Sequence, residues 1–175
     1  MDIIEKFSGA IRTIPDFPAK GVLFRDITPV LADPELCHGI LDELGMRWDG
    51  TQIDAVAGIE SRGFLFGMSL AGKLGVPFVP LRKKGKLPGD TFETEYQLEY
   101  GSAVLEMQKD SLSTGQNVLI HDDLLATGGT AMAGADLVSQ SGANVVGFSF
   151  LIELMFFKGK ELLEEKAKVD ALISY

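Results

Sequence analysis

Residues 118–130 read VLIHDDLLATGGT, and this stretch decides the fold that we expect. The apolar run 118–120 predicts a buried strand, and the polar, glycine-rich residues after it predict a turn. A helix should follow, because small or apolar residues recur on one side at helical spacing: Ala131, Gly134, Ala135 and Val138. A strand, a turn and a helix in this order are typical of a parallel α/β unit.

The same alternation continues on both sides of this unit. Further strands are predicted at 53–57, 76–81, 103–107, 145–151 and 169–173. Between the first two, a helix is expected that ends near Gly75 and carries on one face Phe64, Gly67, Met68 and Ala71. We therefore expect an α/β fold with a mostly parallel sheet flanked by helices. Ligands of such sheets bind beyond the carboxyl ends of the strands.

The N-terminal part of the chain is less regular. A helix that starts after Asp2, with Glu5 completing a capping box, should place on one face Ile4, Phe7, Ile11 and Ile14. Residues 16–29 predict loops, and Asp33 then caps a helix with the apolar stripe Leu36, Ile40 and Leu44. No stretch has the composition of a linker, so we expect one domain over residues 1–175.

Composition and charge narrow the partners that we expect. The formal net charge of −9 predicts repulsion from nucleic acid and from anionic membranes, so neither is an expected partner. No apolar run reaches the roughly 18 residues of a membrane helix. The single cysteine favours a reducing, cytoplasmic location. Residues 82–86 oppose the overall charge with four cations in five positions, which predicts a site for a small polyphosphate.

The glycine-rich turn has the chemistry of a phosphate site. Gly128 and Gly129 allow backbone amides to approach an anion, and the start of the helix adds partial positive charge. Thr127 and Thr130 can donate from their hydroxyls. Asp122 and Asp123 would repel a phosphate, so we expect them to accept hydrogen bonds from ribose hydroxyls. Together these residues predict a site for a ribose 5-phosphate group.

Other phosphate sites fit this stretch less well. A P-loop requires a lysine before the final threonine, where this chain has Gly129, and the dinucleotide pattern G-x-G-x-x-G does not occur. A response-regulator receiver would carry its acid pair near the N-terminus, with a further aspartate and a lysine later in the chain. An acidic turn before a helix cap would explain neither the paired glycines nor both threonines.

Residues 122–130 resemble the phosphoribosyl pyrophosphate signature of type I phosphoribosyltransferases, in the form found in their adenine-using branch. Three further stretches match that branch in order: FPAKGVLFRDITP at 17–29, GIESRGF at 58–64, and RKKGKLP at 82–88, which leads to LEYG at 98–101. The resemblance extends to Glu153. It implies the type I phosphoribosyltransferase fold, with a small N-terminal hood within 1–33 and a flexible lid loop at 83–101.

The resemblance implies transfer of a phosphoribosyl group from phosphoribosyl pyrophosphate to adenine, giving AMP and pyrophosphate with Mg²⁺. The 5-phosphate would be bound by Ala126, Thr127, Gly128, Gly129 and Thr130. The pyrophosphate would be bound by Ser61, Arg62, Arg82, Lys83 and Lys86. The base would be bound by Leu23, Phe24, Arg25 and Leu124.

The same resemblance implies catalytic roles for Arg62, Glu99, Asp122 and Asp123. Glu99 would take part in proton transfer at the adenine ring. A surface glutamate on a strand is an equal interpretation of Glu99. Mg²⁺ would be held mainly through substrate, with no direct protein ligand assigned. A homodimer is also implied.

Two alternatives remain at this point. One is a related phosphoribosyltransferase for another purine, and the other is a phosphoribosyl pyrophosphate sensor that regulates transcription, which neither length nor charge favours. Two departures from the family pattern also stand. His121, where many members carry an aliphatic residue, is predicted to be a spacer on the strand. Residues 155–168 depart from the usual loop, so no contact is predicted there.

Overall fold

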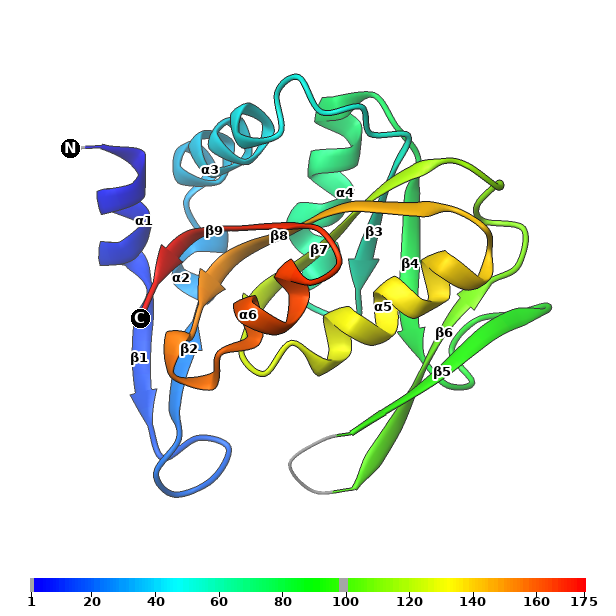
Figure 1. Cartoon of the computed structure of the whole chain (residues 1–175). Coiled ribbons are helices and arrows are strands. Elements are labelled where there is room, and N and C mark those ends of the chain that lie inside the picture. The colour runs from blue at the N-terminus through cyan, green and yellow to red at the C-terminus, as the bar shows by residue number, and fades with distance from the viewer. Residues whose placement is uncertain (1, 98–100) are drawn as a thin grey trace. The chain divides into compact units, whose positions relative to one another are not determined.

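The structure is a computed structural model that describes residues 2–97 and 101–175. Glu99, predicted to act at the adenine ring, therefore lies outside the described residues. The chain divides into two compact units, Met1–Met46 and Arg47–Tyr175, each of which is described by itself (Figure 1). The expectation of one domain over residues 1–175 stays a prediction. Within the described residues, no helix has the length and apolar character needed to cross a membrane.

The N-terminal unit contains a helix followed by a two-stranded antiparallel sheet. Helix α1 (Ile3–Ala10) begins as predicted, with the Asp2 amide donating to the Glu5 carboxylate over 3.2 Å. The prediction that this helix continues to Ile14 is wrong, because β1 (Arg12–Pro15) pairs there with β2 (Leu23–Asp26). Pro15 disfavours helical backbone at Ile14, and the β-branched residues before it suit a strand. The predicted loop at 16–29 is therefore interrupted by β2 and by α2 (Thr28–Leu31).

Helix α3 (Pro34–Arg47) follows the sequence prediction closely. The Leu36 amide donates to the Asp33 carboxylate over 3.0 Å, which caps the helix. The predicted apolar stripe is buried, with Leu36, Ile40 and Leu44 all inaccessible to solvent or nearly so. The helical spacing of these residues thus correctly predicted both the helix and its buried face.

The C-terminal unit is built on a seven-stranded sheet with the order β5-β6-β4-β3-β7-β8-β9. The pairs β4–β3, β3–β7, β7–β8 and β8–β9 are parallel, whereas β5 and β6 form an antiparallel edge. The prediction of a mostly parallel sheet is confirmed. The strands are β3 (Ala55–Ile59), β4 (Phe78–Lys83), β5 (Thr91–Gln97), β6 (Ser102–Gln108), β7 (Asn117–Leu125), β8 (Asn144–Glu153) and β9 (Lys168–Ser174).

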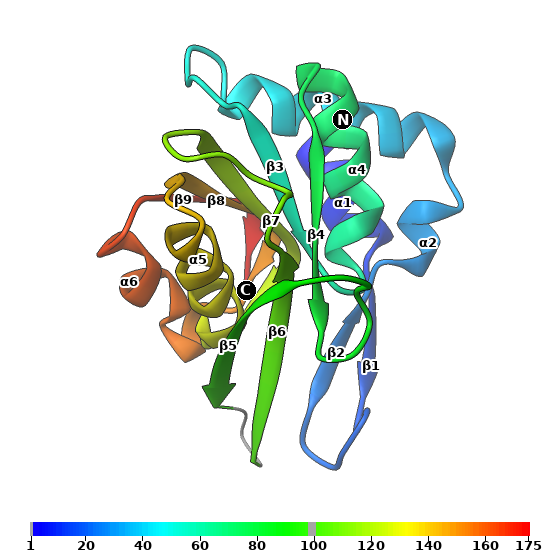
Figure 2. The same ribbon diagram turned by 90° about the vertical axis from the view of Figure 1, so that its right-hand side faces the viewer.

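Helices cover both faces of this sheet. Figure 2 shows α4 (Gly63–Leu74) on one face, with α5 (Gly129–Gln140) and α6 (Gly159–Glu164) on the other. The predicted face of α4 is correct for Gly67 and Ala71, which are buried, but wrong for Met68, which is 60% exposed. Each residue turns a helix by about 100°, so Met68 points away from the face that carries Gly67. The large apolar core lies between the sheet and α5.

The stretch 83–101 is not one continuous loop. Strand β5 occupies Thr91–Gln97 and pairs with β6 along its length, from Thr91↔Gln108 to Gln97↔Ser102. Aromatic side chains alternate with polar ones here, so Phe92 and Tyr96 pack against the core while their neighbours face outward. The Gln140 side chain on α5 also donates to the Thr94 hydroxyl over 2.8 Å. The prediction of a long polar loop is wrong for β5, and its closure over a substrate stays a prediction.

Candidate active site

Strand β7 carries the acid pair within its length. The apolar run 118–120 and His121 were predicted to lie on this strand, and β7 continues to Leu125 because β8 is long enough to pair with it as far as Leu125↔Glu153. Asp123 is 4% exposed, and Asp122 is half-buried beside it. The ladder of strand hydrogen bonds thus fixes the backbone from which both carboxylates project.

Residues 126–130 form the turn from β7 into α5, here named the phosphate loop. Gly128 has φ +83°, a left-handed conformation that glycine adopts at little cost. Helix α5 begins at the next residue, and the Met132 amide donates to the Gly128 carbonyl over 2.9 Å. The first amides of this helix therefore remain available as donors, as a bound anion requires.

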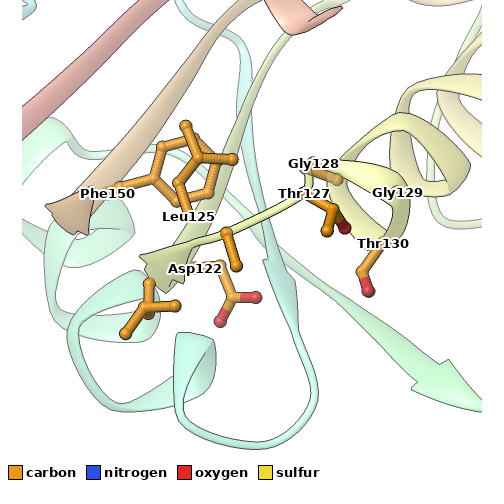
Figure 3. A pocket seen from close by; sticks show the side chains of 10 residues that line it. Asp122, Leu125, Thr127, Gly128, Gly129, Thr130 and Phe150 are labelled. Carbon is orange, nitrogen blue, oxygen red and sulfur yellow. The ribbon is translucent and has the colours of Figure 1, made fainter. Parts of the chain in front are cut away.

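A pocket of about 100 Å³ lies on the phosphate loop. Figure 3 shows Thr127 and Thr130 on the turn and Asp122 further back on β7. The structure thus brings together every residue that was predicted to bind the 5-phosphate with one residue of the acid pair. The full lining is Asp122, Leu124, Leu125, Ala126, Thr127, Gly128, Gly129, Thr130, Ala131 and Phe150.

Arg62 lies beside the acid pair. Its Nε is 2.9 Å from Oδ2 of Asp123, and its side chain is one-third exposed. This contact follows from the sheet, because β3 and β7 are parallel neighbours with Gly58 opposite His121. The turn after β3 contains the Glu60–Ser61 peptide bond, which is cis although residue 61 is not a proline. Ser61 and Arg62, predicted to bind pyrophosphate, therefore lie at the same edge of the sheet as Asp123.

The acid pair holds protons more tightly than ordinary aspartates. Burial raises the pKa of Asp122 well above its usual value, and the charge of Asp123 raises it further. Burial also raises the pKa of Asp123, although the Arg62 guanidinium opposes this shift. The Asp123 amide donates to Asp122 Oδ1 over 2.9 Å, which fixes one carboxylate against the neighbouring backbone. Two carboxylates kept close together in this way suit a partner that supplies hydroxyl donors or positive charge.

The basic residues 82–86 form an ordered turn after β4. Arg82 donates to Glu60 from Nε over 3.3 Å and from Nη2 over 3.1 Å, and its Nη1 donates to the Lys86 carbonyl over 3.0 Å. The Lys83 amide donates to Glu60 over 3.0 Å. Although burial alone would raise it, these donors hold the pKa of Glu60 below its usual value. Because Glu60 directly precedes Ser61, these bonds connect the basic turn to the turn that contains Ser61 and Arg62.

Sequence reasoning missed Glu60 and also Glu106. The buried Glu106 carboxylate accepts a hydrogen bond from the Gly85 amide over 3.0 Å, within the basic turn. Lys83 and Lys86 are exposed on this turn. The basic cluster was readable in the sequence, but no spacing rule joins residues 60, 85 and 106. Only the strand order places them side by side.

The residues predicted to bind the base belong to different units. Leu23, Phe24 and Arg25 lie on β2 in the N-terminal unit, whereas Leu124 lines the pocket in the C-terminal unit. Phe24 is half-buried and packs edge to face with Phe17, their ring centroids 5.1 Å apart. Leu23 is 56% exposed. Their joint role at a base stays a prediction.

Comparison with known proteins gives a consistent result. The family model described as "Phosphoribosyl transferase domain" matches residues 31–174. An adenine phosphoribosyltransferase of Sorangium cellulosum is 54% identical over 157 residues, which cover 90% of this chain and 78% of that protein. An adenine phosphoribosyltransferase structure from Thermoanaerobacter pseudethanolicus matches with a TM-score of 0.96 and 48% identity, covering 98% of this chain and 99% of that one.

A third relative was crystallised with ligands. It is the adenine phosphoribosyltransferase of Saccharomyces cerevisiae, complexed with adenine and an imino-altritol bisphosphate. It matches with a TM-score of 0.92 and 43% identity, covering 98% of both chains. The fold, the site and these three relatives agree, and the chain therefore belongs to the phosphoribosyl transferase domain family.

Proposed function

We propose that this chain transfers the 5-phosphoribosyl group of phosphoribosyl pyrophosphate to adenine, giving AMP and pyrophosphate. One observation carries the proposal. The phosphate loop, the acid pair and Arg62 meet at one edge of the sheet, with Arg62 Nε 2.9 Å from Asp123. The choice of adenine rests on the relatives, which are adenine phosphoribosyltransferases and one of which was crystallised with adenine.

The sugar phosphate occupies the pocket on β7 and α5. The amides of Gly128 and Gly129 and the hydroxyls of Thr127 and Thr130 donate to the 5-phosphate. Asp122 and Asp123 accept hydrogen bonds from the ribose hydroxyls through carboxylate oxygens that can each accept more than one donor. The 5-phosphate therefore anchors one end of the substrate while the acid pair orients the sugar.

The diphosphate lies on the cationic side of the site. Arg62 presents a planar guanidinium suited to bidentate phosphate contacts, and Ser61 adds a hydroxyl. Arg82, Lys83 and Lys86 extend this positive region, with Arg82 held by Glu60. These groups stabilise the negative charge that grows on pyrophosphate as it leaves.

In the reaction, the bond from the anomeric carbon to the pyrophosphate oxygen breaks and its electron pair leaves with pyrophosphate. An imidazole nitrogen of adenine forms the new bond to that carbon, and the ring loses a proton, for which Glu99 is the proposed acceptor. Positive charge develops on the sugar meanwhile, and the carboxylates of Asp122 and Asp123 stabilise it. Residues 83–101 act as a lid that excludes water, and Leu23, Phe24, Arg25 and Leu124 hold the base.

Mg²⁺ is the proposed cofactor. Two carboxylates near a phosphate loop create the negative surroundings that a divalent cation neutralises, so the donor set fits the ion. By analogy with the family, the ion is held mainly through substrate, and no direct protein ligand is assigned. When bound, Mg²⁺ supplies neutralisation of the diphosphate charge.

Two further proposals concern the whole protein. We propose a homodimer, by analogy with the family, and we note that Leu65 and Met68 on α4 are 45% and 60% exposed. We also propose a cytoplasmic location, which the single cysteine favours. Sedimentation of the purified protein tests the first of these proposals.

A base-competition assay tests the proposed function. The protein is incubated with phosphoribosyl pyrophosphate, Mg²⁺ and one of adenine, guanine or hypoxanthine, and the nucleotide and pyrophosphate formed are measured. We expect AMP and pyrophosphate in equal amounts with adenine, and far less GMP or IMP with the other bases. Absence of AMP above background would overturn the adenine assignment, and GMP or IMP as the main product would identify another purine as the substrate.

A further inference from the structure

The segment that follows β8 lies directly behind the phosphate loop. It contains the 3₁₀ helix η1 (Met155–Phe157) and continues into α6, which packs beside α5 (Figure 1). Residues 154–159 are here named the supporting segment. The sequence predicted no contact for this part of the chain, so its position against the loop is a finding of the structure.

Gly159 approaches the phosphate loop so closely that no side chain fits. A Cβ atom on Gly159 would lie 2.1 Å from the Ala126 carbonyl oxygen, 2.8 Å from the Gly128 nitrogen and 2.8 Å from the Thr127 carbonyl carbon. All three are main-chain atoms, which cannot rotate away as the end of a flexible side chain can. A methyl group at position 159 therefore requires either the loop or the supporting segment to move.

The supporting segment is held at both ends. The Leu154 amide donates to the Leu125 carbonyl over 2.8 Å, and the Met155 amide donates to the Tyr175 carbonyl over 3.0 Å. Beyond Gly159, the side chain of Leu163 on α6 is fully buried in the core. The phosphate loop, in contrast, borders the pocket, and Thr127 is exposed there. The loop is consequently the part that would shift.

Gly128 shows the same contact from the other side. A Cβ atom on Gly128 would lie 3.0 Å from the Gly159 carbonyl oxygen and 3.4 Å from Cγ of Leu163. The two glycine backbones therefore pack against each other with no side chain between them. Gly128 also lines the pocket on the phosphate loop, so this contact lies directly behind the proposed 5-phosphate site.

We propose that Gly159 is a positioning residue for the 5-phosphate: it sets the backbone of Ala126–Gly128 from behind, and any side chain there displaces the donors of the phosphate loop. The identity of the anion as a ribose 5-phosphate group rests on the proposed function. The steric relationship between Gly159 and the loop does not depend on the base or on the reaction.

Binding of two separate ligands tests this role. The Kd values of ribose 5-phosphate and of pyrophosphate are measured by calorimetry for the full chain and for Gly159→Ala. The first ligand requires the phosphate loop, whereas the second requires the cationic side of the site. We expect the Kd of ribose 5-phosphate to rise about tenfold to hundredfold, as loss of one hydrogen bond to a charged group does, with the Kd of pyrophosphate nearly unchanged.

Gly147→Ala is a matched control. A Cβ atom there would also lie 2.1 Å from a neighbour, the ring carbon Cη2 of Trp48, but Gly147 lies at the opposite end of β8 from the phosphate loop. We expect this variant to change the melting temperature without separating the two ligand affinities. Leu163→Val is a second test variant, because it removes a contact beneath Gly128 without adding a clash. We expect the same selective loss of ribose 5-phosphate affinity, of smaller size.

The outcomes separate this inference from the proposed function. A selective loss of ribose 5-phosphate in Gly159→Ala or in Leu163→Val supports the positioning role even if the wild-type chain makes no AMP. Equal weakening of both ligands, or unchanged affinity for both, overturns it. If Gly159→Ala does not fold, Leu163→Val decides the question by the same comparison.

Discussion

The Nε atom of Arg62 lies 2.9 Å from Oδ2 of Asp123, so a residue proposed to bind pyrophosphate pairs with one proposed to bind ribose. Arg62 lies in the turn after β3 and Asp123 lies on β7, and the parallel pairing of these two strands makes the side chains neighbours. Asp123 is almost fully buried, whereas Arg62 is one-third exposed. Arg62 can thus balance the Asp123 charge while its own side chain stays partly accessible to solvent.

Replacing Arg62 by alanine should weaken both halves of the site. Loss of the guanidinium removes a phosphate ligand and also leaves the buried Asp123 without its cation, a change that costs about 2 to 5 kcal/mol at buried pairs. We expect the Kd of pyrophosphate to rise by at least tenfold, roughly 1.4 kcal/mol, by calorimetry. Lys73→Ala is the control, because Lys73 lies on the last turn of α4, the helix that Arg62 precedes. This variant should bind pyrophosphate normally. Normal binding by Arg62→Ala would contradict the assignment.

Asp122→Asn should stabilise the protein while lowering its activity. Because the folded-state pKa of Asp122 is raised, its contribution to stability is present below the ordinary pKa and is lost as pH rises through the folded value. Asparagine removes this cost, so the variant should be more stable than the wild type at neutral pH and should show no such gain at pH values below the ordinary pKa of aspartate. Turnover should fall about a hundredfold or more, because an amide does not stabilise positive charge on the sugar.

Thermal unfolding at several pH values and a turnover assay check both parts of this prediction. Asp136→Asn, within α5, is a control for the loss of one negative charge. A variant at Asp122 that unfolds earlier at neutral pH would contradict the argument from burial. Near-normal turnover would contradict the role of Asp122 at the ribose.

The parts of this site that the sequence predicted are those encoded in one continuous stretch. The acid pair, the two glycines and the two threonines all lie within residues 122–130, and their chemistry is legible without knowledge of other strands. The helix of residues 34–47 was equally predictable, since its cap and its apolar stripe are formed by residues close together in the sequence. Local patterns therefore predicted both the phosphate loop and much of the element order.

The parts that the sequence did not predict depend on contacts between distant residues. Nothing near Gly159 signals that Ala126 lies behind it, and Glu60 meets Arg82 only because β3 and β4 are neighbours. Strand β5 was interpreted as loop because its polar residues outnumber its apolar ones, although Tyr96 packs into the core. Tertiary packing, rather than local propensity, determined each of these features.

Glu99→Gln should lower turnover more than affinity if this residue accepts a proton from the adenine ring. An amide cannot accept the proton, but it preserves size and hydrogen bonding, so kcat should fall about a hundredfold with KM for adenine changed little. Steady-state kinetics with adenine as the varied substrate gives both constants. An unchanged kcat would favour a surface glutamate without a catalytic role.

His121→Leu should reduce the sensitivity of the fold to acid. Burial lowers the pKa of His121 to about 4, so the folded protein binds fewer protons than the unfolded chain between that value and about 6.5. Stability from this residue is therefore present above about pH 6.5 and is lost as pH falls toward 4. We compare the free energy of unfolding of the leucine variant with that of the wild type at each pH. The difference should be about 1 to 2 kcal/mol more favourable to the variant at pH 5 than at pH 7.5.

Unfolding in urea at the two pH values measures this gain. The cost of the substitution at neutral pH should be small, since the hydrogen bond between His121 Nδ1 and Ser149 Oγ is long, at 3.3 Å. Among the described residues, Nε2 has no hydrogen-bond partner. The exposed His38, replaced by Gln, serves as a control whose loss should leave the pH dependence unaltered. Equal stability differences at both pH values would show that His121 is not the group responsible.

Glu60→Gln should loosen the basic turn without removing a cation. Arg82 would lose its ionic partner at 3.1 Å, and the Lys83 amide would keep only a neutral acceptor at 3.0 Å. Charged hydrogen bonds of this kind are about twice as strong as neutral ones, so we expect the Kd of pyrophosphate to rise about threefold to tenfold. Ribose 5-phosphate, bound at the phosphate loop, should keep its affinity. Glu93→Gln removes the partner of Lys84 on the same turn and controls for the lost charge, because Glu93 pairs with Lys84 and Glu60 pairs with Arg82. If both variants weakened pyrophosphate equally, net charge rather than the position of Arg82 would account for the effect.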